Sequence, residues 1–269
     1  MKVVIFCGGL GLRLREYSDA IPKPMVPIGP QPILWHNMRY YAHYGHTEFV
    51  LCLGYKASAI KDYFLRYNEA LSNDFILRGD GQMELLGTDI HDWRIAFVDT
   101  GVHALVGQRL RAVQRHIGSD EFFLANYGDN LTDAPLDKLI EDFRRRDKVA
   151  AFLSVAPTHS FHVVHVRGDG LVTGIEGVAA SGLRINGGYF IFRREIFDYI
   201  REGEELVEEP FQRLIAEGQL IAYPHEGFWA PMDTLKDMQT LEALYDAGSP
   251  PWAVWRPVGE DAVPPTTAR

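Results

Sequence analysis

Hydrophobic residues alternate along the first half of the chain between two patterns. Short continuous apolar runs are separated by stretches in which apolar positions recur at helical spacing. Continuous β-branched and aromatic runs are typical of strands buried on both faces of a parallel sheet. We expect such strands at residues 3–7, 49–53, 95–98, 122–125 and 150–155. The intervening helices are predicted at residues 33–44, 60–67, 106–117 and 136–146.

The pattern changes after Pro157, where shorter strands and turns indicate a more antiparallel part of the same fold. Strands are expected at residues 163–166, 171–175, 188–192 and 220–223, and helices at residues 194–201, 210–217 and 234–247. Strands that alternate with helices favour βαβ units with right-handed crossovers. The prediction is therefore an α/β fold with a mixed, mostly parallel central sheet flanked by helices.

The length of 269 residues and the hydrophobic content of 46% allow one large core. We expect a single domain over residues 1–248. The remaining residues, 249–269, are rich in proline and are predicted to form an irregular tail.

The net charge of -9 argues against a surface that holds duplex nucleic acid through many phosphate contacts. The opening stretch has only five apolar residues before the glycines, too few for a signal-peptide core or a membrane span. Cys7 and Cys52 both lie in apolar runs, which is typical of buried, reduced thiols. We therefore expect a cytoplasmic protein with no nucleic-acid or membrane partner.

A glycine-rich loop follows the first predicted strand. Gly8, Gly9 and Gly11 offer backbone N–H groups without a Cβ in the way, beside Arg13, which suits a polyphosphate. A Rossmann fingerprint would need glycine at Leu14, and a P-loop would need Gly-Lys-Ser/Thr, so both are disfavoured. A simple strand-to-helix turn remains open for the loop, and a Rossmann-type oxidoreductase remains the alternative class.

Lys23 lies between Pro22 and Pro24, which restrict the backbone around it. A lysine held in a stiff segment suits a phosphate partner. Flanking prolines also occur in ordinary loops, so this motif gains weight only together with others.

Five motifs in order resemble those of the sugar-1-phosphate nucleotidylyltransferases. They are GGxGxRL after the first strand, PKPM at 22–25, YGD at 127–129, NGG at 186–188 and WAPMDT at 229–234. The resemblance extends from Met1 to about Trp255 and is greatest to the glucose-1-phosphate cytidylyltransferases. It implies a Rossmann-like nucleotide-diphospho-sugar transferase fold, with a nucleotide half at about 1–156 and an acceptor half at about 157–248.

The resemblance also implies Mg²⁺-dependent transfer of a nucleotidyl group from a nucleoside triphosphate, with CTP favoured, to a phosphorylated acceptor, and release of pyrophosphate. Asp129 and Asp233 would bind Mg²⁺, and together with Arg13 and Lys23 they would form the catalytic set. The nucleotide would be bound by Gly8, Gly9, Gly11, Arg13, Lys23, Arg109 and Gly128. The acceptor would be bound by His162, Glu176, Asn186 and Gly187. Relatives of this kind are commonly oligomers, so we expect a homo-oligomer.

The chain departs from the family pattern in three segments. Leu12 stands where the family has Ser or Thr, and His162 stands where it tends to have glycine. Gly177 and Val178 replace the Lys-Pro pair that follows the glutamate, which removes a charge-assisted contact of about 1.5–3 kcal/mol to the acceptor phosphate. The departures fall on the phosphate loop and the acceptor half.

Three interpretations of these departures stay open. The chain could transfer a nucleotidyl group to an altered acceptor. It could use glucose 1-phosphate, with His162 supplying the missing cation together with His165 or Arg184. It could instead be an inactive homologue that binds nucleotide as a regulatory or assembly protein.

Three further features are given structural interpretations. His159, His162 and His165 would alternate between the faces of a strand, which argues against zinc. Residues 202–209, with five glutamates, are predicted to form a solvated loop and helix start. The tryptophans at positions 35, 229 and 252 are expected in the core or at a subunit contact.

Overall fold

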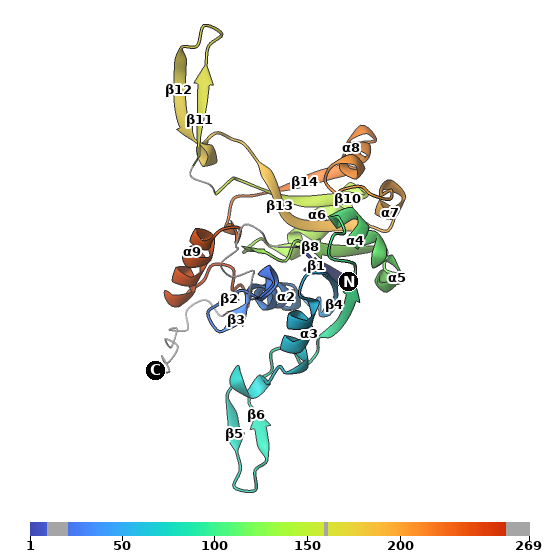
Figure 1. The fold of residues 1–269 in the computed structure, drawn as a ribbon, viewed down its shortest axis with the longest axis vertical. Helices are drawn as coiled ribbons and strands as arrows, with labels where there is room; N and C mark the ends of the chain where they lie inside the picture. The colour runs from blue at the N-terminus through green and yellow to red at the C-terminus, as the bar shows by residue number, and fades with distance from the viewer. Residues whose placement is uncertain (10–20, 159–160, 257–269) are drawn as a thin grey trace.

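A seven-stranded sheet forms the centre of the protein in the computed structural model, which describes residues 1–9, 21–158 and 161–256. The strands lie in the order β14-β10-β13-β8-β1-β4-β7 (Figure 1). Their bounds are β1 Lys2–Phe6, β4 Glu48–Leu53, β7 Arg94–Asp99, β8 Phe122–Asn126, β10 Ala150–Val155, β13 Ile185–Arg193 and β14 Leu220–His225.

The sheet is mixed and mostly parallel, as predicted. β13 runs antiparallel to its neighbours β8 and β10, whereas β14–β10, β8–β1, β1–β4 and β4–β7 are parallel pairs. The chain builds β4 and β7 on one side of β1 and then crosses to β8 on the other side. Ligands of open α/β sheets bind where the strand order reverses in this way, outside the carboxyl ends of the strands.

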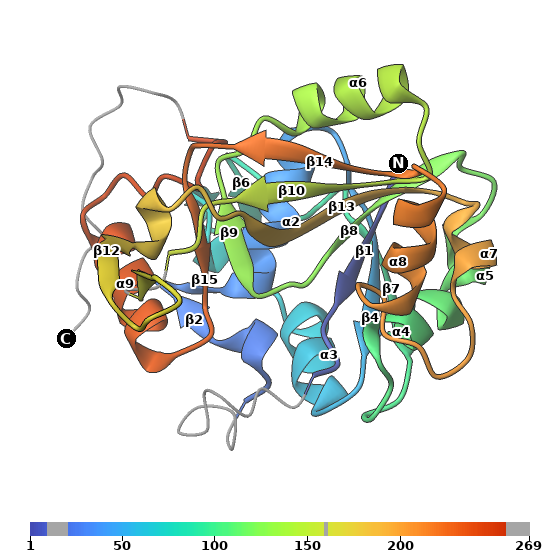
Figure 2. The ribbon, with the colours of Figure 1, turned by 90° about the horizontal axis from the view of Figure 1, so that it is seen from above.

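Helices cover both faces of the sheet. Successive strand residues point to opposite faces, and the strands carry apolar side chains on both, so each face needs a covering layer. In β1, Val3 and Ile5 pack in the cluster that contains residues of α2, α3 and α6, whereas Val4 and Phe6 pack in the cluster of α4, α5, α7 and α8. Figure 2 shows α6 and α8 on opposite sides of β10 and β14. The helix bounds are α2 Ile33–His43, α3 Ala57–Leu65, α4 Val106–Ala112, α5 Gln114–Ile117, α6 Leu136–Arg146, α7 Ile196–Tyr199 and α8 Glu209–Ala216.

A third apolar cluster lies beside the sheet and includes Val26, Ile28, Met232, Leu241 and Trp252. Its residues come from β2 (Pro27–Ile28), which pairs with β3 (Gln31–Pro32), from the ribbon of β9 (Asn130–Thr132) and β15 (Trp229–Pro231), and from α9 (Leu235–Asp246). Val26 directly follows the short helix η2 (Lys23–Met25). Trp35, Trp229 and Trp252 were expected in the core or at a subunit contact, and all three are buried in the core of the chain.

Two β-hairpins project from opposite ends of the body in Figure 1. One consists of β5 (Phe75–Leu77) and β6 (Met83–Leu85) and follows the short helix η3 (Glu69–Leu71). The other consists of β11 (His162–Val166) and β12 (Val172–Gly177) and precedes η4 (Val178–Ala180). Both hairpins expose large apolar side chains. The first hairpin was not expected from the sequence.

The predicted helix over 106–117 is two helices, because the backbone leaves helical geometry at Val113 (φ -95°, ψ 1°). The predicted helix over 194–201 is only one turn, α7. Cys7 and Cys52 are free and buried, as expected, and belong to clusters on opposite faces of the sheet. Within the described ranges, no helix combines the length and apolar composition needed to cross a membrane.

Candidate active site

A cleft of about 460 Å³ opens beyond the carboxyl ends of β1 and β8. This is the point of the sheet at which the strand order reverses. The charged and glycine residues that line it include Gly8, Gly9, Lys23, Arg109, Asp129, Glu205 and Asp233. Residues that are distant in sequence therefore share one concave surface.

Lys23 forms the charged centre of the cleft. Its Nζ lies 2.6 Å from Oδ2 of Asp129 and 2.7 Å from Oδ1 of Asp233, and donates a hydrogen bond to each. Burial alone would lower the pKa of Lys23, but the two carboxylates outweigh it, and the pKa is raised above its ordinary value. Lys23 thus stays cationic and holds the two acidic groups together.

The ribbon of β9 and β15 places the two carboxylates side by side. Asn130 pairs with Pro231, and the carbonyl of Asp129 accepts a hydrogen bond from the N–H of Met232 at 2.8 Å. Asp129 therefore precedes one strand of the ribbon, and Asp233 follows the other just before the N-cap of α9.

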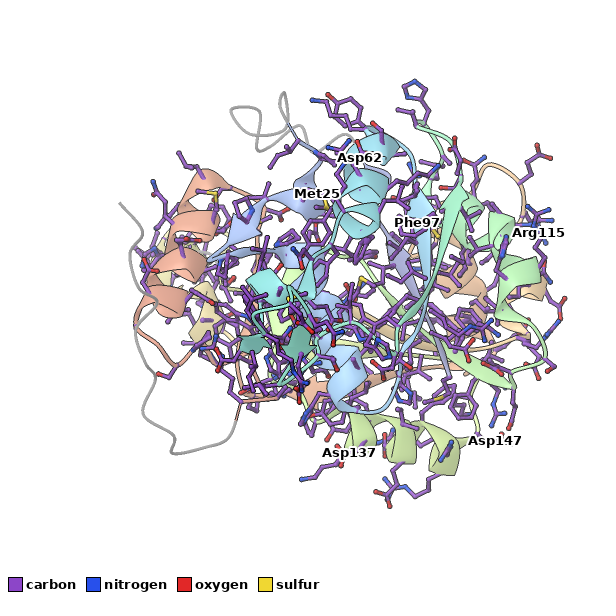
Figure 3. The ribbon with its side chains drawn as sticks, turned by 90° about the horizontal axis from the view of Figure 1, so that it is seen from below. Met25, Asp62, Phe97, Arg115, Asp137 and Asp147 are labelled. Carbon is purple, nitrogen blue, oxygen red and sulfur yellow. The ribbon has the colours of Figure 1, made fainter. Side chains whose placement is uncertain are left out.

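Lys23 is held by η2, a single 3-10 turn between two prolines. The N–H of Met25 donates to the carbonyl of Pro22, and Pro24 is buried. The turn contacts α2 and α3, and Figure 3 shows Met25 beside the part of α3 that carries Asp62. The stiff segment inferred from the prolines is thus anchored to the body of the protein.

Arg109 holds the start of the glycine loop through a hydrogen bond to the backbone of Gly8. Its guanidinium donates to the carbonyls of Gly8 (3.0 Å) and Val102 (3.2 Å) and to Oγ1 of Thr100 (2.8 Å), and the side chain is almost fully buried. Burial lowers the pKa of Arg109. A Cβ added at Gly8 would lie 1.9 Å from this guanidinium, so only glycine allows this contact. Arg109 therefore shapes the loop and also lines the cleft.

Gly128 makes the turn that delivers Asp129 into the cleft. Its φ of +78° is in the region that favours glycine, and its N–H donates to Oδ1 of Asn126. A Cβ there would also lie 3.0 Å from Ile5 of β1. The YGD motif thus needs glycine for both conformation and space.

Residues 2–259 match the family described as "Nucleotidyl transferase". The chain belongs to this family. The resemblance inferred from the five motifs is thereby confirmed, as is the predicted class of enzyme, a nucleotidyltransferase.

Two curated relatives of this nucleotidyl transferase align over nearly the whole chain. A glucose-1-phosphate cytidylyltransferase from Salmonella typhimurium is 37% identical over 256 residues, which cover 95% of this chain and 100% of the relative. A glucose-1-phosphate cytidylyltransferase from Salmonella typhi is 36% identical with the same coverage. These relatives support nucleotidyl transfer to a sugar phosphate.

Among solved structures, a UDP-glucose pyrophosphorylase complexed with UDP-glucose superposes with a TM-score of 0.68. It covers 91% of this chain and 97% of that chain at 14% identity. At this identity the likeness concerns the fold alone, and it confirms the predicted fold class.

The residues expected to bind the acceptor fall into two groups. Asn186 and Gly187 lie in β13 next to the cleft: Nδ2 of Asn186 donates to the hydroxyl of Tyr127, which lines the cleft, and the carbonyl of Gly187 accepts from Nε1 of Trp229 at 2.8 Å. His162 and Glu176 lie on the projecting hairpin of β11 and β12 and are not among the residues that line the cleft. The structure therefore does not bring all four together.

The other cations considered for the acceptor have protein partners. Nε2 of His165 lies 2.7 Å from Oε1 of Glu176, and Arg184 pairs with Glu226 and donates to the carbonyl of His225. Gly11, Leu12, Arg13 and His159 lie outside the described residues.

Glu205 was not predicted from the sequence to be a residue of the site. It belongs to the acidic stretch expected to be solvated, yet it lines the cleft of this nucleotidyl transferase. Oε2 accepts a hydrogen bond from the N–H of Val106 (3.2 Å) at the start of α4, and Oε1 accepts from the N–H of Leu206 (2.9 Å). The apolar Leu206 within the run of glutamates was the signal that part of this segment turns inward, since its side chain is fully buried.

The paired carboxylates suit a magnesium ion. Mg²⁺ is usually bound by one or two carboxylates, waters and substrate phosphates. Asp129 and Asp233 supply two carboxylates at one point of the cleft, and within the described ranges no group of three or more His, Cys, Asp or Glu residues is placed to hold a metal ion. The donor set therefore fits Mg²⁺ better than zinc, which prefers nitrogen and sulfur ligands.

Proposed function

We propose that this nucleotidyl transferase joins the nucleoside monophosphate of CTP to a phosphorylated acceptor with the help of Mg²⁺ and releases pyrophosphate. The observation that carries the proposal is the meeting of Lys23, Asp129 and Asp233 in the cleft beyond β1. The acceptor is glucose 1-phosphate or an atypical sugar phosphate or other phosphate. The relatives from Salmonella support the choice of CTP and of a sugar phosphate.

In the proposed reaction, an oxygen of the acceptor phosphate attacks the α-phosphorus of the nucleotide in line. The bond from the α-phosphorus to the bridging oxygen breaks, and pyrophosphate leaves with that oxygen. Because the nucleophile is already an anion, no general base is required. Catalysis then comes from positioning and from neutralising the charge of the two reactants.

The residues of the chain divide this work. Backbone N–H groups at Gly8 and Gly9 would cradle the triphosphate, in a loop whose shape Arg109 maintains. Lys23 would donate to phosphate oxygens, which compete with Asp129 and Asp233 for its ammonium group. The two carboxylates would hold Mg²⁺, which when bound neutralises charge on the phosphate oxygens.

Two interpretations of the identity of the acceptor remain open. Gly177 supplies no cation, and His165 and Arg184 are engaged with carboxylates, which supports an altered acceptor. The similarity to glucose-1-phosphate cytidylyltransferases supports the ordinary acceptor. A screen of acceptors distinguishes the two.

We also propose that the enzyme is a cytoplasmic homo-oligomer in which a second copy covers the projecting hairpins. In β11/β12, Val164 and Ile175 face each other across the hairpin, and in β5/β6, Leu77 faces Met83. All four are at least 49% exposed in the single chain. Apolar faces of this kind on a two-stranded hairpin are typical of contact surfaces.

The test is a pyrophosphate-release assay with ATP, CTP, GTP and UTP against a panel of sugar phosphates, other phosphates and phosphonates, with and without Mg²⁺. We expect turnover with CTP that requires Mg²⁺. Asp129→Asn and Asp233→Asn should each lower turnover at least about a hundredfold, because each removes charge from the reacting centre. The matched control is Asp92→Asn, which changes an exposed aspartate outside the cleft.

The alternatives predict other results. Nucleotide binding without pyrophosphate release from any acceptor would indicate the inactive homologue. Binding of NAD(P)H without dependence on Mg²⁺ would indicate an oxidoreductase. Near-normal turnover in either aspartate variant would refute the assignment of the two carboxylates.

A further inference from the structure

The cleft holds one carboxylate that is separate from the Lys23 centre. Glu205 bonds to the backbone at the start of α4, whereas Asp129 and Asp233 bond to Lys23. Figures 1 and 2 show α4 and α8, the helices that flank Glu205, on one side of β1 and α9, which follows Asp233, on the other. Among the described residues, no ion pair joins Glu205 to Lys23 or to Arg109.

The position of Glu205 is built into the packing. A Cβ at Gly107, in the first turn of α4, would lie 2.6 Å from the carbonyl oxygen of Glu204 and 3.3 Å from the nitrogen of Leu206, so glycine allows the segment before α8 to approach α4. Glu204 pairs with Arg213, and Leu206 is fully buried. Glu205 is therefore held between two anchored residues, and its orientation does not depend on a ligand.

The carboxylate keeps capacity to accept further hydrogen bonds. An ionised carboxylate accepts hydrogen bonds at about four lone-pair sites and donates none. The N–H groups of Val106 and Leu206 use two of them, one on each oxygen. Ligand groups that carry N–H or O–H donors are therefore favoured beside Glu205, whereas phosphate and carbonyl oxygens would be repelled.

We infer that Glu205 accepts a hydrogen bond from the exocyclic amino group of cytosine and thereby selects CTP over UTP and dTTP. Cytosine carries an N4 amino donor where thymine, and likewise uracil, carries the O4 acceptor, and carboxylates are natural partners of that amino group. The inference rests on the proposed nucleotidyl transfer and assigns the choice of nucleobase in the same cleft to a named residue.

The test is isothermal titration calorimetry of CTP and UTP with Mg²⁺ on the full chain and on Glu205→Gln. The side-chain amide can donate to O4 of uracil but offers a weaker, uncharged acceptor to cytosine. We expect the affinity for CTP to fall about ten- to a hundredfold while the affinity for UTP is unchanged or rises. Glu202→Gln makes the same chemical change at an exposed position of the same acidic stretch and should keep the wild-type ratio.

A second measurement uses the unmodified protein and so does not depend on how the variant folds. CTP with two methyl groups on N4 has lost the amino donor and should bind as weakly as UTP. The inference is overturned if the ratio of CTP to UTP affinity is the same in Glu205→Gln as in the wild type, or if dimethylated CTP binds as well as CTP.

Two further outcomes distinguish failure of the base contact from failure of the proposed function. If Glu205→Gln weakens CTP but leaves 2′-deoxy-CTP unaffected, Glu205 contacts the ribose and the inference is overturned, although nucleotidyl transfer stands. If the wild type binds no nucleoside triphosphate, the proposed function itself fails and the inference fails with it.

Discussion

Asp129 and Asp233 lie at the same end of one antiparallel ribbon, because the residue after Asp129 pairs with Pro231 and the carbonyl of Asp129 bonds to Met232. The distance between their side chains is therefore set by the register of β9 and β15, and a shift of this register would move the two carboxylates apart. The ammonium group of Lys23 reduces the electrostatic repulsion between the carboxylates of Asp129 and Asp233. The geometry of the centre is thus fixed by backbone pairing before any ligand binds.

Replacement of the shared cation tests this arrangement. In Lys23→Gln the two partly buried carboxylates face each other without a counter-charge, so we expect the free energy of unfolding to fall by about 2 kcal/mol. Added Mg²⁺ should raise the melting temperature of Lys23→Gln more than that of the wild type. Thermal unfolding with and without Mg²⁺ measures both effects, and exposed Lys138→Gln is the control. Equal responses to Mg²⁺ in the two proteins would argue against a site at Asp129 and Asp233.

The two adjacent glycines of the loop should differ in their tolerance of a side chain. Gly8→Ala would place a methyl group against the Arg109 guanidinium, whereas a Cβ at Gly9 meets nothing within 4 Å. We expect Gly8→Ala to lower the free energy of unfolding by about 2 kcal/mol and Gly9→Ala by about 0.5 kcal/mol or less. Urea unfolding of the pair measures the difference. Equal stabilities would mean that Arg109 does not brace the loop.

The projecting hairpins should control the state of assembly. Val164→Glu with Ile175→Lys makes one face of the β11/β12 hairpin polar, and we expect a smaller mass by light scattering with an unchanged circular dichroism spectrum. His165→Gln changes the opposite face of the same strand and should leave the mass unchanged, since neighbouring strand residues point to opposite sides. A monomeric wild type, or a mass that does not respond to the apolar pair, would contradict the proposed contact.

The free energy of unfolding should decrease in mild acid because His36 is buried in its neutral form. This side chain donates to the carbonyl of Ile28 and accepts from Nε1 of Trp252, and burial lowers its pKa from the ordinary 6.5 to about 4. Between these two values the unfolded chain binds a proton that the folded chain does not, so the free energy of unfolding decreases as the pH falls from 6.5 towards 4. The loss from His36 should total about 3 kcal/mol.

Urea unfolding at a series of pH values measures this dependence. In His36→Gln, the slope of the free energy of unfolding against pH should decrease by the equivalent of one proton over that range. Part of the slope should remain, because burial also lowers the pKa of His46 to about 4. An identical slope in wild type and variant would exclude His36 as a source of acid sensitivity.

The regular elements of the fold could be predicted where burial follows the period of the structure. α6 occupies the predicted residues, since Leu136, Leu139, Ile140 and Phe143 form one buried stripe. The break at Val113 could not be predicted, because Leu110, Val113 and Ile117 all face the same cluster and preserve helical spacing across it. The β5/β6 hairpin was missed because its apolar residues are exposed in the single chain and carry no burial pattern.

The candidate site was predictable only in part. An aspartate after a strand is by itself typical of a turn or a cap, and the meeting of Asp129 with Asp233 depends on the pairing of β9 with β15, which no local pattern encodes. Resemblance to a family supplied that long-range information. It gave no indication of Glu205, whose place in the cleft comes from the packing of Leu206 and from the space at Gly107.

The third apolar cluster has a consequence for protein synthesis. It joins residues next to Lys23 at the start of the chain with Met232, Leu241 and Trp252 near its end. A nascent chain that has emerged from the ribosome only as far as β13 carries the glycine loop and Asp129 but lacks Asp233 and the late residues of this cluster, Met232, Leu241 and Trp252. The centre therefore assembles late in translation, and a chain released early should be inert even when most of its central sheet has formed.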